Sequence, residues 1–331
     1  LGMLIETCRG TGLASSGVLA NSAVLDADGD GLPDLAVAAS SSRFRPHAPG
    51  RADLLVAAED GHGVRVEFEY SPLTRPGVHV ASRTSTYPVA DYAAPAVVVS
   101  RLTASDGAGG TYRLDYAYEG AKTHALGRGF LGFARSSVSD SRDGLTTVSD
   151  HLQDPAAFDQ LGAASAVTVA KPDGSPLVRT TYSWGRIASG TGYESRSFPY
   201  VASLSTDRYE LDGTRVSNTY VRNLVDAYGT VTSRLVQTTE VGTGLNPGSQ
   251  HWERRTLTSV VNDAPNWCLG RALGVQVTRG HSLPGGTEIT RTVTRTVDPS
   301  KCRATQEVDE PNDPVARLTT DLAYDAYGNP T

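Results

Sequence analysis

Apolar and polar residues alternate along most of this chain, in runs that Gly, Pro and Asp-Gly pairs interrupt. Two clear runs cover residues 64–70 and 112–118. Alternation with a period of two places successive side chains on opposite faces of a β-strand, whereas an amphipathic helix repeats every 3.6 residues. The sequence therefore predicts an all-β chain built from long, twisted antiparallel hairpins.

Asp-Gly pairs mark several of the expected turns. They stand at Asp60-Gly61, Asp106-Gly107, Asp143-Gly144, Asp173-Gly174 and Asp212-Gly213. The segment 209–216 is the clearest candidate for a two-residue type I′ hairpin, because both central positions of that turn need a positive φ.

A second turn pattern places Asp three residues before Gly. It occurs at Asp226 with Gly229 and at Asp325 with Gly328. An Asp side chain caps a turn by accepting backbone N–H groups, and Gly takes a positive φ without a steric penalty. Both segments are therefore predicted to be Asp-capped turns.

Helix signals are sparse. Asp154 is a candidate N-cap, Pro155 suits the first helical position and Gly162 is a candidate stop. The segment 156–161 is barely two turns long, so a short helix and a surface turn are equally consistent with it.

The longest legible hairpin covers residues 269–299. A turn at 283–287 gives paired residues whose numbers sum to 570, so that Leu273 faces Val297 and Val277 faces Val293. This register predicts one buried face and one polar face rich in threonine.

The same register sets Cys268 opposite Cys302. A disulfide between them is expected if the protein matures outside the cytosol. The third cysteine, Cys8, has no evident partner, and the spacing of the cysteines is not that of a zinc site.

Carboxylates recur at alternate positions near the N-terminus, in the loop from Asp26 to Asp34. Ca²⁺ binds six to eight oxygen atoms, and a glycine allows such a loop to turn sharply around the ion. The predicted calcium ligands are the side chains of Asp26, Asp28, Asp30 and Asp34 and the backbone carbonyl of Leu32.

Two alternatives to this calcium loop are an EF-hand and a solvated turn. An EF-hand needs a Glu at loop position 12, where this chain has Val37, and it needs helices on both sides, whereas the flanks at 22–25 and 35–38 are strand-like. A plain solvated turn leaves four uncompensated carboxylates within nine residues. A calcium-binding β-hairpin loop is the interpretation that these observations favour.

Charge and motifs exclude several classes of function. The net charge is −6, and the basic residues, nearly all Arg, form no block, which argues against a nucleic-acid or anionic-membrane footprint. The chain contains no run of about 18 apolar residues, the length that a helix needs to span a bilayer. No G-x-S-x-G elbow, phosphate-binding loop or HExxH helix occurs, so we expect no enzymatic activity.

Five blocks of sequence resemble a known family. The loop 26–34 with its apolar flanks is similar to the FG-GAP or VCBS repeat of β-propellers. The blocks 60–74, 112–133 with its GRGFLGF segment, and 262–271 look like the propeller exit and middle region of SpvB-type and toxin-complex B-component proteins. The chain ends at 324–331 in the form of an Rhs/YD repeat, which Val225 to Thr230 echoes.

The resemblance implies an architecture. Residues 1–58 correspond to a terminal propeller segment with the calcium loop, 59–150 to the propeller exit and the GRGFLGF segment, and 151–331 to hairpins that lead into YD repeats. The fold expected from it is a strip of an Rhs-type β-shell preceded by the last propeller blade. We accordingly expect the chain to be an internal piece of a longer protein.

The resemblance also implies a role in secreted virulence proteins. Such proteins enclose a toxic C-terminal polypeptide in a hollow shell, and the implied partners are the remainder of the polypeptide, a C-component-like shell partner and a pore-forming translocation subunit. No nucleic acid is expected as a partner. The alternative is a calcium-dependent cell-surface or carbohydrate-binding adhesin, which needs a compact cluster of exposed aromatic and polar groups.

Overall fold

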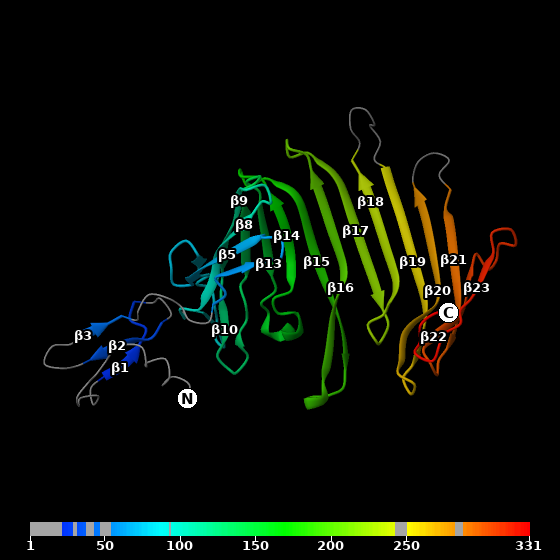
Figure 1. Ribbon diagram of the computed structural model, residues 1–331, viewed down its shortest axis with the longest axis horizontal. Helices are drawn as coiled ribbons and strands as arrows, with labels where there is room; N and C mark the ends of the chain where they lie inside the picture. The colour runs from blue at the N-terminus through cyan, green and yellow to red at the C-terminus, as the bar shows by residue number, and fades with distance from the viewer. Residues whose placement is uncertain are drawn as a thin grey trace. The chain divides into compact units, whose positions relative to one another are not determined.

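Figure 1 shows a computed structural model of the chain. It describes residues 22–28, 32–37, 43–46, 54–92, 94–241, 250–281 and 287–331. The chain divides into two compact units, Leu1–Leu145 and Thr146–Thr331, which are treated separately below.

The first unit contains short strands. They are β1 (Ser22–Leu25), β2 (Asp34–Val37), β3 (Arg43–Arg45), β4 (Ala57–Glu59), β5 (Arg65–Pro72), β6 (His79–Val80), β7 (Val89–Asp91), β8 (Val97–Ser105), β9 (Thr111–Glu119), β10 (Lys122–His124), β11 (Gly129–Phe130) and β12 (Arg135–Asp140). Strands β1, β2 and β3 form one antiparallel sheet, and β7, β10 and β11 form another. Strands β4, β5, β8, β9 and β12 pair antiparallel in that order, while β6 pairs with β9 in parallel.

Strand β5 follows the predicted alternation. Val66, Phe68 and Tyr70 are half-buried, while Arg65, Glu67 and Glu69 between them are exposed. The apolar residues of this run therefore share one face of the sheet, as a period of two requires.

The second unit is one antiparallel sheet of long strands, each paired with the next along the chain. The strands are β13 (Thr146–His151), β14 (Ala164–Ala170), β15 (Pro176–Ser189), β16 (Arg196–Tyr209), β17 (Arg215–Val225), β18 (Val231–Glu240), β19 (Gln250–Asp263), β20 (Cys268–His281), β21 (Ile289–Asp298), β22 (Arg303–Asp309) and β23 (Leu318–Asp321). Figure 1 shows them side by side as a strip. The prediction of an all-β chain of long antiparallel hairpins is confirmed.

An apolar row crosses part of this strip on one face. Tyr182 pairs with Leu204, Leu204 with Val221, and Val221 with Val236. Paired residues of antiparallel strands point to the same face, so these side chains pack against one another. Val221 is only 6% exposed, which marks this row as a local core.

The expectation of one fully buried face on the hairpin at 269–299 is wrong. Val275, Val277 and Val293 are half-buried, as are Thr292 and Thr294 on the other face. The reason is that the second unit, as far as it is described, is a single sheet in which no second layer packs against these strands.

The register of this hairpin also differs from the prediction. Gly274 pairs with Thr294 and Val275 with Val293, so paired numbers sum to 568 instead of 570. A shift of two residues leaves every side chain on its predicted face, so the alternation of the sequence alone cannot detect it.

The predicted type I′ turn at 209–216 is a different turn. The Glu210 amide donates to the Thr214 carbonyl and the Gly213 amide to the Glu210 carbonyl, so three residues form the loop. Gly213 alone takes a positive φ, of 88°. This is the three-residue hairpin with a glycine bulge, which needs one left-handed position instead of two.

The segment after Asp154 is a 3₁₀ helix, η2 (Pro155–Gln160). The Asp154 carboxylate accepts a hydrogen bond of 2.8 Å from the Ala156 amide, as an N-cap should. A second short 3₁₀ helix, η3, covers Gly192–Glu194. Within the described part of the chain, no helix has the length and apolarity needed to cross a membrane.

Candidate functional site

The predicted calcium loop connects β1 to β2. Leu25 and Asp34 are the last cross-strand pair before the loop, so the hairpin brings both ends of the acidic segment together. One carboxylate oxygen from each of Asp26, Asp28 and Asp34 lies within 4.8 Å of the others. Asp34 is 1% exposed and accepts a hydrogen bond of 3.0 Å from the Ala27 amide.

This arrangement fits a hard cation better than it fits a solvated turn. Asp26 is half-buried, and Asp28 is exposed at the mouth of the cluster. Burying like charges together is unfavourable unless a cation offsets them, and carboxylate oxygens are the ligands that Ca²⁺ prefers. Leu32 follows in the same loop and is half-buried, whereas Asp30 lies outside the described residues. The strands on both sides of the loop agree with the rejection of an EF-hand.

The Asp-capped turns are present as the sequence predicts. The Asp226 carboxylate accepts hydrogen bonds of 2.9 Å from the amides of Tyr228 and Thr230. Gly229, the glycine of this turn, has a φ of 85°. Asp325 caps its own turn in the same way, with the amides of Tyr327 and Asn329 as donors.

The same turn occurs twice in the first unit, where sequence reasoning saw only Asp-Gly pairs. Asp60 accepts from the amides of His62 and Val64, and Asp106 from those of Ala108 and Gly110. Gly63 and Gly109, three residues after these aspartates, have φ values of 81° and 92°. The spacing of three between Asp and Gly was the signal that could have identified both.

Asp226 also joins two neighbouring hairpins, a contact that sequence reasoning missed. The Asn262 side-chain amide donates a hydrogen bond of 2.7 Å to the Asp226 carboxylate. The Asn262 carbonyl oxygen in turn accepts one of 2.8 Å from the Gly270 amide. Burial tends to raise the pKa of Asp226, but hydrogen bonds from Asn262 and from the amides of its turn outweigh burial and hold that pKa below its usual value.

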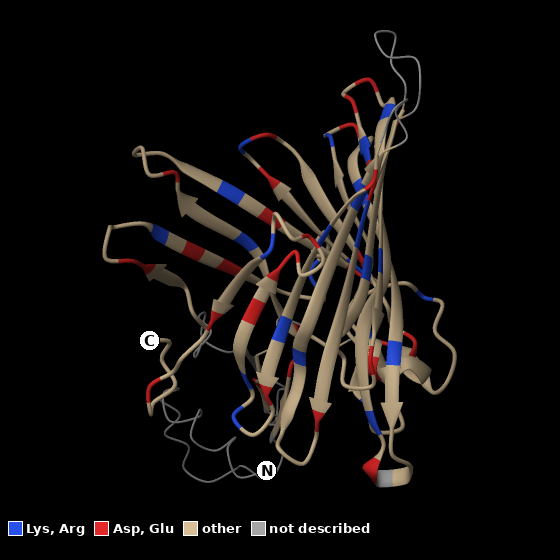
Figure 2. Ribbon diagram, turned by 90° about the vertical axis from the view of Figure 1, so that its right-hand side faces the viewer, with Lys and Arg blue, Asp and Glu red and all other residues tan. Residues whose placement is uncertain are grey.

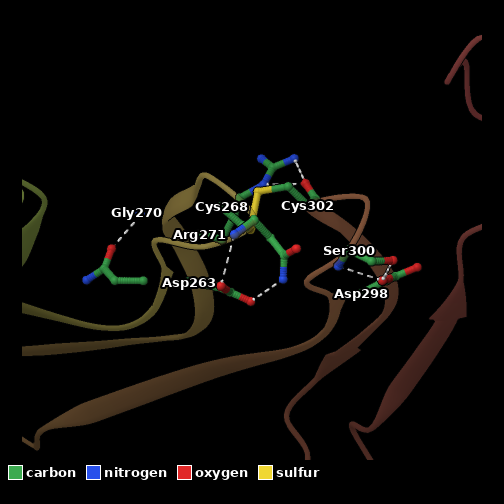
Figure 3. Close-up of a disulfide and its surroundings, with 9 residues drawn as sticks. Asp263, Cys268, Gly270, Arg271, Asp298, Ser300 and Cys302 are labelled. Carbon is green, nitrogen blue, oxygen red and sulfur yellow. Dashed lines mark hydrogen bonds between the residues drawn. A yellow bond between two sulfur atoms is a disulfide. The ribbon is translucent and has the colours of Figure 1, made fainter.

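The next connection along the strip is covalent. Cys268 at the start of β20 and Cys302 after β21 form a disulfide with their Cα atoms 5.2 Å apart (Figure 3), which confirms the predicted pair. The Arg271 guanidinium donates bonds of 2.8 and 2.6 Å to the Cys302 carbonyl. Cys8 lies outside the described residues. These contacts fix the turns between β17 and β22 to one another.

Removing the Asp226 carboxylate tests this connection. Asp226→Ala is expected to lower the free energy of unfolding by about 1–3 kcal/mol, because the turn amides and the Asn262 side chain lose their acceptor. Urea denaturation measures the change. In a double-mutant cycle, adding Asn262→Ala should cost less in the Asp226→Ala background than in the parent, since the shared bond is already gone. Full additivity would contradict the link.

The turn aspartates also predict a dependence on pH. Backbone amides of Ala108 and Gly110 lower the pKa of Asp106, and the side chain and amide of Asn329 lower that of Asp325. A carboxyl whose pKa is depressed on folding stabilises the fold above its unfolded pKa, and this stability is lost as the pH falls through the folded value. Thermal unfolding should therefore occur at lower temperature below pH 3.8, the usual carboxyl pKa.

The matched variant for this pH effect is Asp106→Asn combined with Asp325→Asn. Asparagine keeps an acceptor oxygen for the turn but does not titrate in this range. The variant should lose less stability than the parent between pH 5 and 3. Identical profiles for the two proteins would show that these turns do not contribute to acid sensitivity.

The GRGFLGF segment forms an aromatic cluster in the first unit. Tyr118 and Phe133 have ring centroids 4.7 Å apart, and those of Phe130 and Phe133 are 5.5 Å apart. Leu131 is 2% exposed, so it packs into the sheet as expected, while Phe130 remains half-exposed at the edge of the cluster. Gly132 between them has a φ of 83°, a backbone conformation that favours glycine.

His79 borders this cluster and has no counterpart in the sequence predictions. Its Nε2 atom accepts a hydrogen bond of 3.2 Å from the Ala121 amide, which requires an unprotonated ring nitrogen. Burial lowers the pKa of His79, although the charge of Asp91 opposes this shift. His79 therefore acts as a packing residue that fastens β6 to the loop after β9.

The second unit is thus a single antiparallel strip of long hairpins, with capping aspartates and a disulfide at its turns. Residues 11–155, somewhat less than half of the chain, match the family described as "Insecticide toxin TcdB middle/N-terminal region". This match confirms the resemblance to toxin-complex proteins that the sequence blocks indicate. None of the curated proteins compared with the chain matches it.

Solved toxin-complex structures have a similar fold. The crystal structure of TcdB2-TccC3 without its hypervariable C-terminal region superposes with a TM-score of 0.64 at 10% identity, covering 87% of this chain and 20% of that chain. The Photorhabdus luminescens Tc holotoxin pore gives a TM-score of 0.63 at 11% identity, with 87% and 19% covered. This chain thus spans about a fifth of the length of either structure's chain. The SpvB and FG-GAP resemblances remain predictions.

Proposed function

We propose that this chain is a structural segment of a toxin-complex shell protein, whose strands form part of the wall around a toxic C-terminal polypeptide. The observation that carries the proposal is the strip β13–β23, in which each long strand pairs with the next. Its similarity to the TcdB2-TccC3 structures supports a wall role, because such a sheet encloses space without a thick core. The family match over residues 11–155 supports the same class.

The proposed partners follow from the same comparisons. Among the similar structures are TcdB2-TccC3 complexes and a Tc holotoxin pore. We infer that this chain assembles with the remainder of its own polypeptide, with a C-component-like partner and with a pore-forming subunit. A secreted location is proposed as well, and the Cys268–Cys302 disulfide supports it, since disulfides persist in oxidising compartments.

Calcium binding and the absence of catalysis are part of the proposal. The clustered carboxylates of Asp26, Asp28 and Asp34 would hold Ca²⁺ and neutralise their mutual repulsion, which stabilises the β1–β2 hairpin. Such an ion has a structural role here. We propose no reaction for this chain, because the contacts described above connect strands and turns.

Coexpression tests the proposed function. The complete gene product is expected to form a stable complex with a C-component-like protein from the same source, seen as one peak of combined mass in size-exclusion chromatography. The control replaces the partner with an unrelated secreted protein of similar size. Separate elution of the gene product and its partner at micromolar concentration would contradict a shared shell.

The adhesin alternative needs exposed aromatic residues gathered at one site. Phe158, Tyr228 and Trp267, which is 81% exposed, lie in different connections of the strip, namely η2, the β17–β18 turn and the β19–β20 turn. The Asp226–Asn262 hydrogen bond joins the turns that carry Tyr228 and Trp267, so these are the side chains that an adhesin would use. A glycan array with the full chain would distinguish the two, since an adhesin should bind a defined glycan in a calcium-dependent way.

A further inference from the structure

Two arginines face each other across neighbouring strands of the strip. Arg254 in β19 pairs directly with Arg279 in β20. Like charges directly opposite one another destabilise a sheet. Among the described strands this is the only cross-strand pair of two arginines.

Other cross-strand arginines of the two units stand opposite a carboxylate or a neutral residue. Arg101 pairs with Asp115, with Nε 2.5 Å from the carboxylate, and Arg295 pairs with Glu307 at 2.6 Å. Arg254 and Arg279 differ from these arginines because the cross-strand partner of each is a second positive charge.

Two further arginines extend the pair on the same face. Val236 pairs with Arg254, so Arg234, two residues away in β18, shares the face of that arginine. In β21, Arg291 pairs with Val277, which lies two residues from Arg279. Arg234, Arg254, Arg279 and Arg291, called the arginine row below, thus lie on four neighbouring strands. Arg254 and Arg279 are direct partners, whereas Arg234 and Arg291 are diagonal neighbours at about 7–8 Å.

The arginine row is exposed and largely uncompensated. All of its members are solvent-exposed. Arg291 lies 3.7 Å from a Glu310 carboxylate oxygen, whereas Arg234, Arg254 and Arg279 form no ion pair with any carboxylate of the described residues. Figure 2 shows such basic positions on neighbouring long strands. A chain of net charge −6 thus concentrates free positive charge on one sheet face.

We propose that the arginine row is a docking surface for an acidic polypeptide segment. Arginine binds carboxylates through paired N–H donors, and arginine is enriched at protein interfaces. Val236, Val277 and Ile289 lie between the arginines on the same face. A partner strand with alternating acidic and apolar side chains matches this mixture.

Nucleic acid fits the same face less well. Single-stranded nucleic acid is bound through basic grooves with aromatic platforms on which bases stack. The residues between the arginines are aliphatic and hydroxyl-bearing, as Thr256 between Arg234 and Val277 illustrates. The nearest aromatic rings on this face are Trp252, which is half-buried, and His281, and they lie beside the row and not between its arginines. The proposal does not depend on the shell function, because it concerns a charged surface of the second unit alone.

The opposite face of the same strands supplies a matched control. Arg222 in β17 and Arg255 in β19 lie on that face, where both pair with Leu235. Both are exposed, and Arg255 has a Glu253 carboxylate 3.0 Å away. Replacing this pair removes the same charge from the chain without touching the arginine row.

The test uses a labelled peptide of alternating Glu and Val, with fluorescence anisotropy at low salt and the full chain as receptor. Arg254→Gln combined with Arg279→Gln is expected to weaken binding about tenfold, and Arg222→Gln combined with Arg255→Gln less than about twofold. A peptide with Gln in place of Glu should bind weakly to every variant. The thermal midpoint of the Arg254→Gln and Arg279→Gln protein should not fall, because the substitutions relieve repulsion.

Three outcomes would overturn the proposal. The first is unchanged peptide affinity in the Arg254→Gln and Arg279→Gln protein while its fold is intact. The second is an equal loss in the Arg222→Gln and Arg255→Gln control, which would indicate attraction by overall charge. The third is tighter binding of a single-stranded oligonucleotide of the same charge, lost in the same variant, which would make the surface a nucleic-acid site.

Discussion

Loss of the Cys268–Cys302 disulfide is expected to lower the free energy of unfolding of the second unit by about 3–4 kcal/mol. The bond closes a loop of 34 residues, and opening it returns conformational entropy to the unfolded chain. It also frees the turn after β21, which Arg271 then holds through the Cys302 carbonyl alone. Urea denaturation of oxidised and reduced protein measures the difference.

The control for this experiment is the same comparison in a Cys268→Ser, Cys302→Ser protein. Reductant should leave that variant unchanged, which separates the disulfide from other effects of the reagent. A parent protein whose midpoint is the same with and without reductant, although mass spectrometry shows the bond broken, would contradict the predicted contribution.

Removal of calcium is expected to destabilise the first unit by about 2–3 kcal/mol when the ion had been present at about one hundred times its dissociation constant. The carboxylates of Asp26, Asp28 and Asp34 lie within 4.8 Å of one another, so their repulsion returns when the ion leaves. Differential scanning calorimetry with calcium and with EDTA measures the shift.

Asp28→Ala is the diagnostic variant, because Asp28 is exposed and its loss leaves the buried Asp34 contacts intact. The difference between calcium and EDTA should nearly vanish in this protein. Asp60→Asn, in another acidic turn of the first unit, should preserve it. Equal melting of the parent protein with and without millimolar calcium would refute the metal site.

The fold class was predictable because a period of two is a direct property of strands. The Asp-capped turns at Asp226 and Asp325 were predictable for a similar reason, since capping and positive φ restrict the residues that fit. The exact hairpin register was not, because shifting it by two residues preserves both faces. The turn at 209–216 was misassigned because Asp-Gly suits both a two-residue turn and a bulged three-residue loop.

Sequence patterns could not predict the contacts between neighbouring hairpins. The Asn262–Asp226 hydrogen bond joins residues 36 positions apart, and no local rule pairs them. The disulfide was predicted from a register that proved to be shifted, and Cys302 lies in the turn after β21, beyond the strand residues to which that register applies. The opposition of Arg254 and Arg279 likewise becomes visible only once the strands are paired.

We propose that these strands form part of the wall of a closed shell. Limited proteolysis of the complete gene product assembled with its partner tests this most directly, with the toxic C-terminal polypeptide followed by an epitope tag. The tagged polypeptide is expected to survive protease in the assembly and to be degraded once the shell is opened with denaturant. Rapid degradation of the tagged polypeptide in the intact assembly would contradict it.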